Sequence, residues 1–162
     1  MSEQRMSRQD YLDTMSNTWD TYLAALNSLP ESDQKRYAQQ QGFSSLKDVL
    51  AHINDWWEET LRVVPLWARG EAPQFDYDDY DTFETRAMAR HHDQNLAQIE
   101  QDFENLRGQV AALIAELPET AFANPQITAW LYRVIIAHYQ KHEPAAEAQI
   151  PAAKHQDVYK NE

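Results

Sequence analysis

Apolar residues recur every three or four positions along most of this chain, which is the spacing of an amphipathic α-helix. Series of this kind occupy residues 7–29, 45–69, 81–117 and 124–148. In the second series the apolar positions are Leu46, Val49, Leu50, Ile53, Trp57, Leu61 and Val64. The chain has only 3 glycines and helix-forming residues dominate it, so a turn-rich β architecture is poorly supported. The pattern predicts an all-α protein with four long helices.

Capping residues indicate where the first two helices begin. Ser7 is followed three positions later by Asp10, which is the arrangement of a capping box. Ser44 or Ser45 stands in the same way before the second helix, with Asp48 in its first turn. We therefore expect helices that start at about residues 7 and 45.

Glycine, proline and polar segments indicate the remaining boundaries. Gly70 should end the second helix, and Asn124 followed by Pro125 should begin the fourth. Residues 30–43 are polar and are expected to form a loop with room for a helical turn near 33–38. The third helix is predicted to run without a break over 81–117, with Gly108 as its weak point.

Composition narrows the class of protein. The 162 residues suit one domain over 1–150 with a polar tail over 151–162, and the absence of cysteine excludes disulfides and thiolate ligands. A net charge of -12 disfavours nucleic acid and anionic membrane surfaces as partners. The N-terminus lacks the apolar core of a signal peptide, so we expect a cytoplasmic protein.

Three histidines are the candidate ligands of a divalent metal. His138 and His142 are four residues apart and lie on one face of a helix, and His52 lies in the second helix. If the second and fourth helices are antiparallel, His52 lies about 12 Å and the pair about 9–15 Å from the same end of the bundle. That arrangement requires up-down-down-up topology, with a long crossover over 70–80 between the second and third helices.

Three neutral imidazoles leave a coordination position open, as in catalytic zinc sites, and nickel is the other leading metal. The glutamate base of a metalloprotease is missing, because Tyr139 follows His138. Asp55, Glu59 and Glu143 are candidates for a general base or for orienting a ligand, or they are solvated surface charges. The alternative for the whole trio is a set of hydrogen-bonded histidines inside the bundle.

Other residues bear on a ligand pocket. Trp56 and Tyr139 are expected to line a pocket beside the histidines. The acidic and aromatic segment 75–83 is expected either to line the mouth of this pocket or to anchor a solvated crossover. His91 or His92 is a substitute ligand if the third helix shifts its register, and His155 belongs to the tail. The tryptophans at helix flanks that favour a homodimer are Trp67 and Trp130.

Two motifs carry a resemblance to a known family. The run from Ser45 to Trp56, with His52 four residues before the tryptophan, and the run from Ala137 to His142 resemble the DinB/YfiT-like superfamily of four-helix bundles. Within it, the sequence is most similar to the ClbS/DfsB family. The resemblance covers about residues 8–148, and the superfamily's metal triad falls on His52, His138 and His142.

The resemblance implies two kinds of function. Superfamily members include thiol-dependent isomerases and transferases and a group of metal-dependent hydrolases, which suggests a stress or detoxification enzyme acting on a small-molecule substrate. The ClbS branch protects its host from a genotoxin, which suggests a metal-free or non-catalytic protein that binds a toxin. All three histidines are present, and this favours the metal-binding side.

Overall fold

The computed structural model describes residues 6–144, and every regular element in this range is helical. The all-α class is therefore confirmed. The first long helix contains α1 (Arg8–Asp13), a π-helical turn η1 (Thr14–Thr18), a 3-10 turn η2 (Trp19–Thr21) and α2 (Tyr22–Asn27). It is followed by α3 (Glu31–Gln40) and by α4 (Leu46–Ala68).

The second half of the chain holds the remaining elements. α5 (Tyr80–His91) and α6 (Leu96–Glu116) precede a 3-10 turn, η3 (Glu119–Ala123). The last long helix consists of α7 (Pro125–Leu131), a π-helical segment η4 (Tyr132–Ala137) and α8 (His138–His142). The predicted continuation of this helix to residue 148, and the tail with His155, lie outside the described residues.

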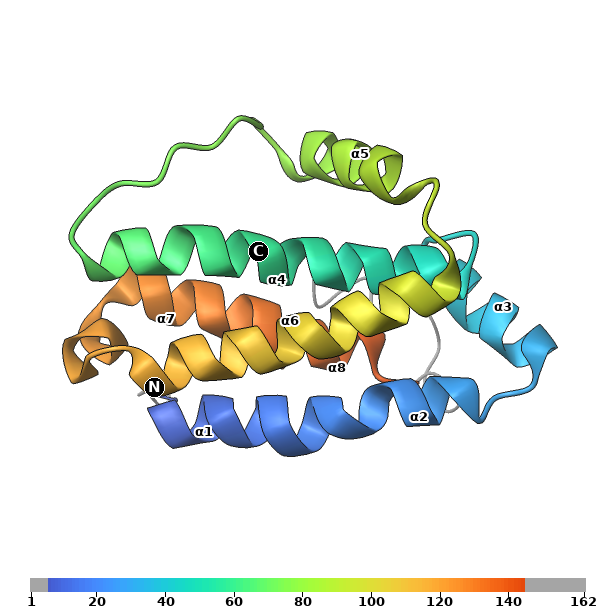
Figure 1. Cartoon of the computed structure of the whole chain (residues 1–162), viewed down its shortest axis with the longest axis horizontal. Coiled ribbons are helices and arrows are strands. Elements are labelled where there is room, and N and C mark those ends of the chain that lie inside the picture. Colours follow the sequence, from blue (N-terminus) through green and yellow to red (C-terminus); the bar gives the residue numbers. More distant parts are fainter. Residues whose placement is uncertain (1–5, 145–162) are drawn as a thin grey trace.

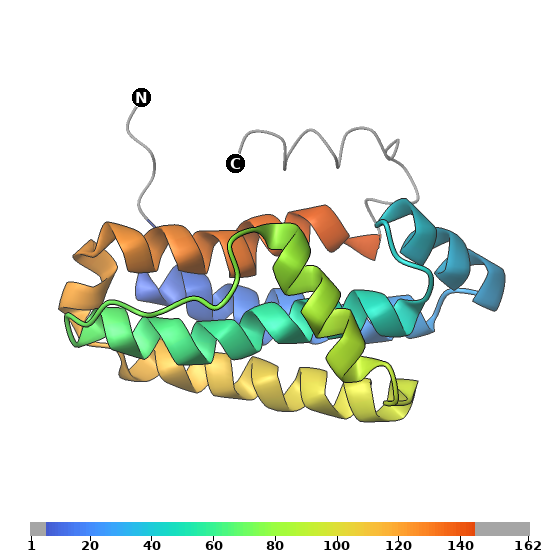
Figure 2. The ribbon, with the colours of Figure 1, turned by 90° about the horizontal axis from the view of Figure 1, so that it is seen from above.

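The helix of α1 and α2, α4, α6 and the helix of α7 and α8 lie side by side along the molecule (Figure 1). The helix of α1 and α2 and the helix of α7 and α8 run in one direction, and α4 and α6 run in the opposite direction. Thus α4 is antiparallel to α8, which is the relation needed to bring His52 toward His138. The view from above shows the same four rods with α5 laid obliquely across α4 (Figure 2).

Local capping chemistry explains where the helices start and stop. Ser7 and Asp10 form the predicted capping box, the Ser45 side chain accepts a hydrogen bond from the backbone N–H of Asp48, and Asn124 caps α7. Gly70 ends α4 with a φ of 77°, a left-handed conformation that glycine adopts without strain. These boundaries agree with the sequence-based predictions.

The predicted third helix is wrong in one respect, because it is interrupted at residues 92–95. α5 ends at His91, and Asn95 then forms a second capping box with Gln98 at the start of α6. The Asn95 side chain competes for backbone N–H groups and so favours a new helix start over continuation of the old one. Gly108, in contrast, lies inside an uninterrupted α6.

The segment expected as a loop over 30–43 is mostly the ten-residue helix α3. Pro30 precedes it, Glu31 and Asp33 lie in its first turn where negative charge suits the helix dipole, and Tyr37 and Ala38 are buried. Only a narrow apolar stripe marks this helix in a polar stretch. That is why the hydrophobic pattern alone understated it.

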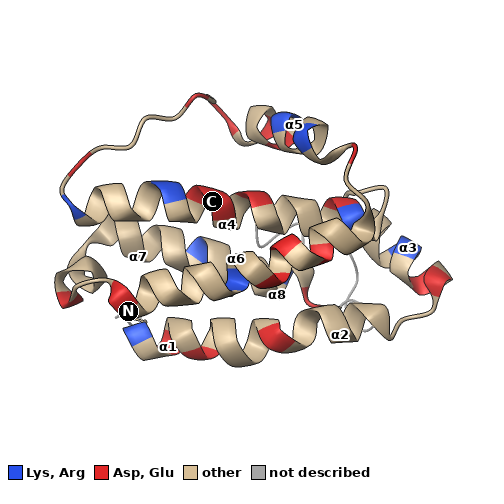
Figure 3. Cartoon of the chain, viewed as in Figure 1, with Lys and Arg blue, Asp and Glu red and all other residues tan. Residues whose placement is uncertain are grey.

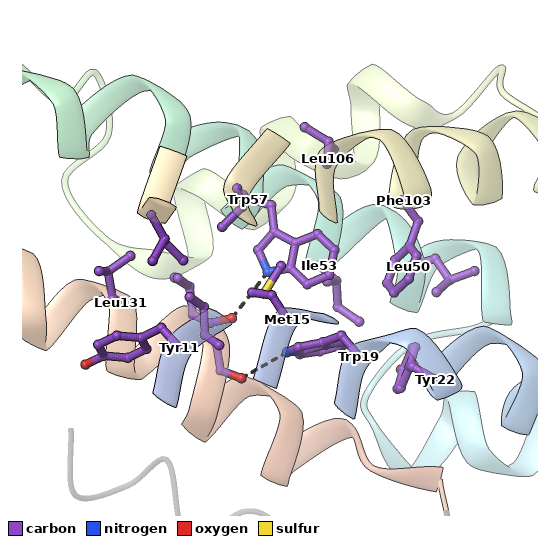
Figure 4. Close-up of a cluster of buried hydrophobic side chains, with 14 of the residues drawn as sticks. Tyr11, Met15, Trp19, Tyr22, Leu50, Ile53, Trp57, Phe103, Leu106 and Leu131 are labelled. Atoms are coloured by element: carbon purple, nitrogen blue, oxygen red, sulfur yellow. Dashed lines mark hydrogen bonds between the residues drawn. The ribbon is translucent and has the colours of Figure 1, made fainter. Parts of the chain in front are cut away.

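The core between the four rods is rich in aromatic side chains. Trp19, Trp57 and Phe103 have no exposed surface, and the Trp19 and Trp57 rings meet edge to face with centroids 4.9 Å apart (Figure 4). Each of these indoles also donates a hydrogen bond to a backbone carbonyl of η4, as the dashed lines in Figure 4 mark. The core therefore holds the last helix by polar as well as apolar contacts.

The crossover is longer than the predicted 70–80, because the third helix is interrupted. Residues 69–95 join α4 to α6 and consist of an extended stretch, α5 and a short turn (Figure 1). Arg62 on α4 donates to the backbone carbonyl of Gln74 at 2.8 Å, and Arg90 on α5 pairs with Asp55 on α4 at 2.7 Å. Charged residues are otherwise spread along α1, α3, α4 and α6 (Figure 3). Among the described helices, none is both long and apolar enough to cross a membrane.

Candidate metal centre

His52 from α4 and His138 and His142 from α8 form a buried cluster. One ring nitrogen from each residue lies within 4.8 Å of the other two. The ring centroids are 4.8 to 5.1 Å apart, and each pair of rings meets edge to face. The structure thus brings together the three histidines that the sequence singled out.

The π-helical segment η4 lies directly before His138. A π-helical turn holds an extra residue, so it changes the direction in which later side chains point, and such turns are frequent at functional sites. The indole of Trp19 donates to the carbonyl of Ile135 at 3.0 Å, and that of Trp57 donates to the carbonyl of Val134 at 3.3 Å. These bonds satisfy backbone groups in the segment that sets the direction of His138 and His142.

His52 is oriented by Glu84, a residue of α5 that sequence reasoning did not select. Glu84 Oε1 lies 2.5 Å from His52 Nδ1, and it also accepts a hydrogen bond of 3.1 Å from the indole of Trp56. With Nδ1 engaged by the carboxylate, Nε2 is the nitrogen that faces the cluster. No motif marked Glu84, because it lies 32 residues after His52 on a separate helix.

His142 is held by two residues of the α3 region. Its Nδ1 lies 2.7 Å from Gln41 Oε1, which directs Nε2 toward the other histidines. Tyr37 donates its hydroxyl proton to the backbone carbonyl of His142, and the hydroxyl of Tyr22 lies 2.6 Å from that of Tyr37. Side chain and backbone of His142 are therefore both fixed from outside its own helix.

The surroundings of His138 disfavour its protonation. Burial first, then the nearby His52 and Lys141, hold the pKa of His138 well below its ordinary value. An imidazole that stays neutral keeps a lone pair for a metal ion. Its Nε2 lies 2.8 Å from Nε2 of His52, which is a hydrogen-bonding distance.

A cavity of about 650 Å³ opens beside His52 and His138. Five aromatic side chains line it, and they come from α4, the crossover and α7: Trp56, Phe75, Tyr77, Tyr80 and Trp130. Charged residues in the wall are Asp78 and Asp79 on the crossover and Arg133 and Lys141 on the last helix. Its size and its aromatic lining are those of a site for a small molecule.

The two predicted pocket residues lie in different places. Trp56 lines the cavity and stacks on Tyr80 at 5.9 Å. Tyr139 instead packs against Trp19 and Tyr22, with ring centroids 5.1 and 6.3 Å away, and it is not among the residues that line the cavity. Tyr139 follows His138 directly, so the helix turns it about 100° away from the histidine.

The candidate bases make no described contact with the ring nitrogens of His52, His138 or His142. Asp55 and Glu59 line a second, smaller cavity of about 410 Å³, which does not include the three histidines. Asp55 is paired with Arg90, and Glu59 is paired with Arg62. Glu143 is the half-buried residue that ends α8. Among residues 6–144, the carboxylate that reaches the cluster is that of Glu84.

The remaining histidines within the described range lie outside the cluster. His91 Nε2 lies 2.7 Å from Asp55 Oδ1, and the Asp55 hydrogen bond raises the pKa of His91 while burial opposes that rise. His92 is exposed, and its backbone carbonyl accepts a hydrogen bond from Lys47. Neither serves as a substitute ligand in this structure. Trp67 and Trp130, considered for a dimer face, pack on each other at 5.6 Å.

The donor set fits a divalent metal ion such as zinc. Imidazole nitrogens suit zinc and nickel, and two such nitrogens on one tetrahedral zinc lie roughly 3.3 Å apart. The 2.8 Å between His52 and His138 is within a small ring rotation of that value. Two of the three imidazoles also have an oxygen acceptor behind them, which is the usual support of a metal-ligating histidine.

The protein is a helical bundle with a buried cluster of three histidines beside a cavity lined by aromatic side chains. The family model of the DinB superfamily matches residues 14–143, so the chain belongs to the DinB superfamily. No match was found among curated proteins or among solved structures.

Proposed function

We propose that this protein is a divalent-metal-dependent enzyme that acts on a small molecule, as a hydrolase or a thiol-dependent transferase in stress or detoxification. One observation carries the proposal. Ring nitrogens of His52, His138 and His142 lie within 4.8 Å of one another, and His52 and His138 also line a 650 Å³ cavity that can admit a substrate.

Different residues would bind the metal, position the ligands and contact the substrate. His52, His138 and His142 would hold the ion, and zinc or nickel would supply Lewis acidity that makes a bound water or thiol a better nucleophile near neutral pH. Glu84 and Gln41 hold two of the ligating imidazoles in place. Trp56, Tyr80 and neighbouring aromatic rings would give the substrate an apolar contact surface.

The cavity wall indicates the kind of substrate. Trp56 stacks on Tyr80, and Phe75 stacks on Trp130 at 6.4 Å, so flat aromatic faces border the space from the crossover and from the bundle. Such walls bind flat or apolar groups. We expect a small molecule with a planar apolar part, either a substrate or a toxin.

A second function is favoured by the His52–His138 contact. At 2.8 Å the two Nε2 atoms can share a proton, so His52 and His138 can form a hydrogen-bonded pair without an ion. In that case the aromatic cavity serves a metal-free binding or resistance protein of the ClbS type, which protects against a genotoxin.

Metal analysis of the untagged protein separates the two functions. Wild type, taken as purified and after reconstitution with zinc or nickel, is compared with His138→Ala. The control is His92→Ala, which removes an exposed histidine outside the cluster. We expect about one metal ion per chain in wild type and control and a large loss in His138→Ala. Wild-type protein that stays without stoichiometric metal would overturn the enzyme proposal in favour of the binding protein.

A further inference from the structure

We infer that Glu84 is a positioning residue of the metal centre, which holds the His52 imidazole through Nδ1 and so strengthens metal binding at Nε2. The inference rests on the proposed metal-binding function. It assigns a role to a residue that provides no ligand atom to the three-histidine cluster.

The Glu84 carboxylate is largely buried and contacts two side chains of α4. Its side chain is 14 % exposed, although glutamate is among the residues that are rarely buried. Its Oε1 lies 2.5 Å from His52 Nδ1 and accepts a hydrogen bond of 3.1 Å from the indole N–H of Trp56. The other oxygen, Oε2, is buried and has no hydrogen-bond partner among the described groups. Burying a charge costs free energy unless the charge is paired and hydrogen-bonded, and the contacts of Oε1 with His52 and Trp56 supply that compensation.

The contact with His52 has a defined chemical effect. A carboxylate that accepts the Nδ1 proton of an imidazole fixes the tautomer, leaves the lone pair on Nε2 and makes that nitrogen more basic. Trp56 lies one turn after His52 on α4 and binds the same oxygen, so the carboxylate is aligned by two donors from one helix. The arrangement therefore favours one ring orientation of His52.

The crossover carries Glu84 to this position. α5 lies obliquely across α4 (Figure 2), and Phe83 packs against Trp56 with ring centroids 4.1 Å apart. Tyr80, one turn before Glu84, lines the cavity and lies 6.2 Å from the His52 ring. The same helix thus supplies a wall of the substrate cavity and the support of a metal ligand.

The test compares the metal affinity of Glu84→Gln with that of wild type, by competition with a chelating indicator for zinc and for nickel. Glutamine keeps the shape and a hydrogen-bond acceptor but removes the charge. We expect an affinity roughly 10–100-fold weaker, the usual cost of losing such a support. Asp81→Asn is the control, because it removes an exposed charge from the same helix. An affinity of Glu84→Gln within about twofold of wild type would overturn the inference.

The tautomer of His52 in metal-free protein tests the role of Glu84 independently of whether the protein binds a metal. Nitrogen-15 chemical shifts of His52 report which ring nitrogen carries the proton in protein treated with a chelator. We expect the proton on Nδ1 in wild type and a mixture of tautomers in Glu84→Ala, with thermal melting used to verify folding. If wild type binds no metal, the proposed function fails. A wild-type His52 without a proton on Nδ1 would overturn the role of Glu84 itself.

Discussion

The indole Nε1 of Trp19 donates a hydrogen bond of 3.0 Å to the carbonyl of Ile135, and both groups are buried. This bond joins the first helix to the π-helical segment that precedes His138. It connects the aromatic core with the direction of His138 and His142, because this segment directly precedes α8.

Loss of this donor should destabilise the protein. Trp19→Phe keeps an aromatic ring in the core but leaves the Ile135 carbonyl without its indole partner. We expect the free energy of unfolding to fall by about 1–3 kcal/mol, measured by urea denaturation. Trp67→Phe, at a half-buried position near the end of α4, is the control and should cost less. Equal losses in the two variants would contradict the role of the hydrogen bond.

Gln41 and Tyr37 should have separable effects, although both contact His142. Gln41→Leu removes the acceptor at His142 Nδ1, so zinc affinity should fall by roughly tenfold or more. Tyr37→Phe removes a bond to the backbone carbonyl of His142, so it should lower stability by about 1 kcal/mol and change affinity less. Indicator competition and urea denaturation measure the two quantities. The reverse pattern would show that Gln41 does not orient the imidazole.

Metal should stabilise the folded state if the three histidines bind it. Free zinc at about 100 times its Kd adds roughly 2.7 kcal/mol, which corresponds to an increase in Tm of about 5–10 °C for a domain of this size. Addition of a chelator should reverse the shift, as followed by differential scanning calorimetry. In His142→Ala the shift should be absent. A shift of the same size in that variant would place the bound metal elsewhere.

The sequence predicted the helical class, the capped starts at Ser7, Ser45 and Asn124, and the histidine trio. Those features depend on local chemistry and on periodicity, which a sequence shows directly. It reduced α3, whose buried stripe is narrow, to a helical turn within a loop. It missed the break at Asn95, whose capping box competes with a long apolar series.

The supports of the trio were beyond sequence reasoning for a different reason. Glu84 lies 32 residues from His52, and Gln41 lies 101 residues from His142. Each is one polar residue among many on a surface-like helix, and only the docking of α5 and α3 places it against an imidazole. Asp55 and Glu59 lie within two helical turns of His52 in the sequence, but in the structure they pair with arginines.

The pair of His91 and Asp55 should make stability depend on pH. The hydrogen bond from Asp55 raises the pKa of His91 above its ordinary value of 6.5. A histidine whose folded pKa is raised contributes stability that is fully present below the unfolded pKa and is lost as pH rises through the folded pKa. Between about pH 6 and pH 8, wild type should therefore lose more stability than His91→Gln. Parallel stability profiles from urea denaturation would exclude this contribution.

The separation of α4 and α8 in the sequence should affect folding kinetics. His52 and His138 are 86 residues apart in sequence, so their nitrogens meet only after α4 and α8 have docked. Contacts of such long range form late, and interactions absent from the transition state act on the unfolding rate. We therefore expect a bound ion to leave the refolding rate almost unchanged and to lengthen the lifetime of the native state.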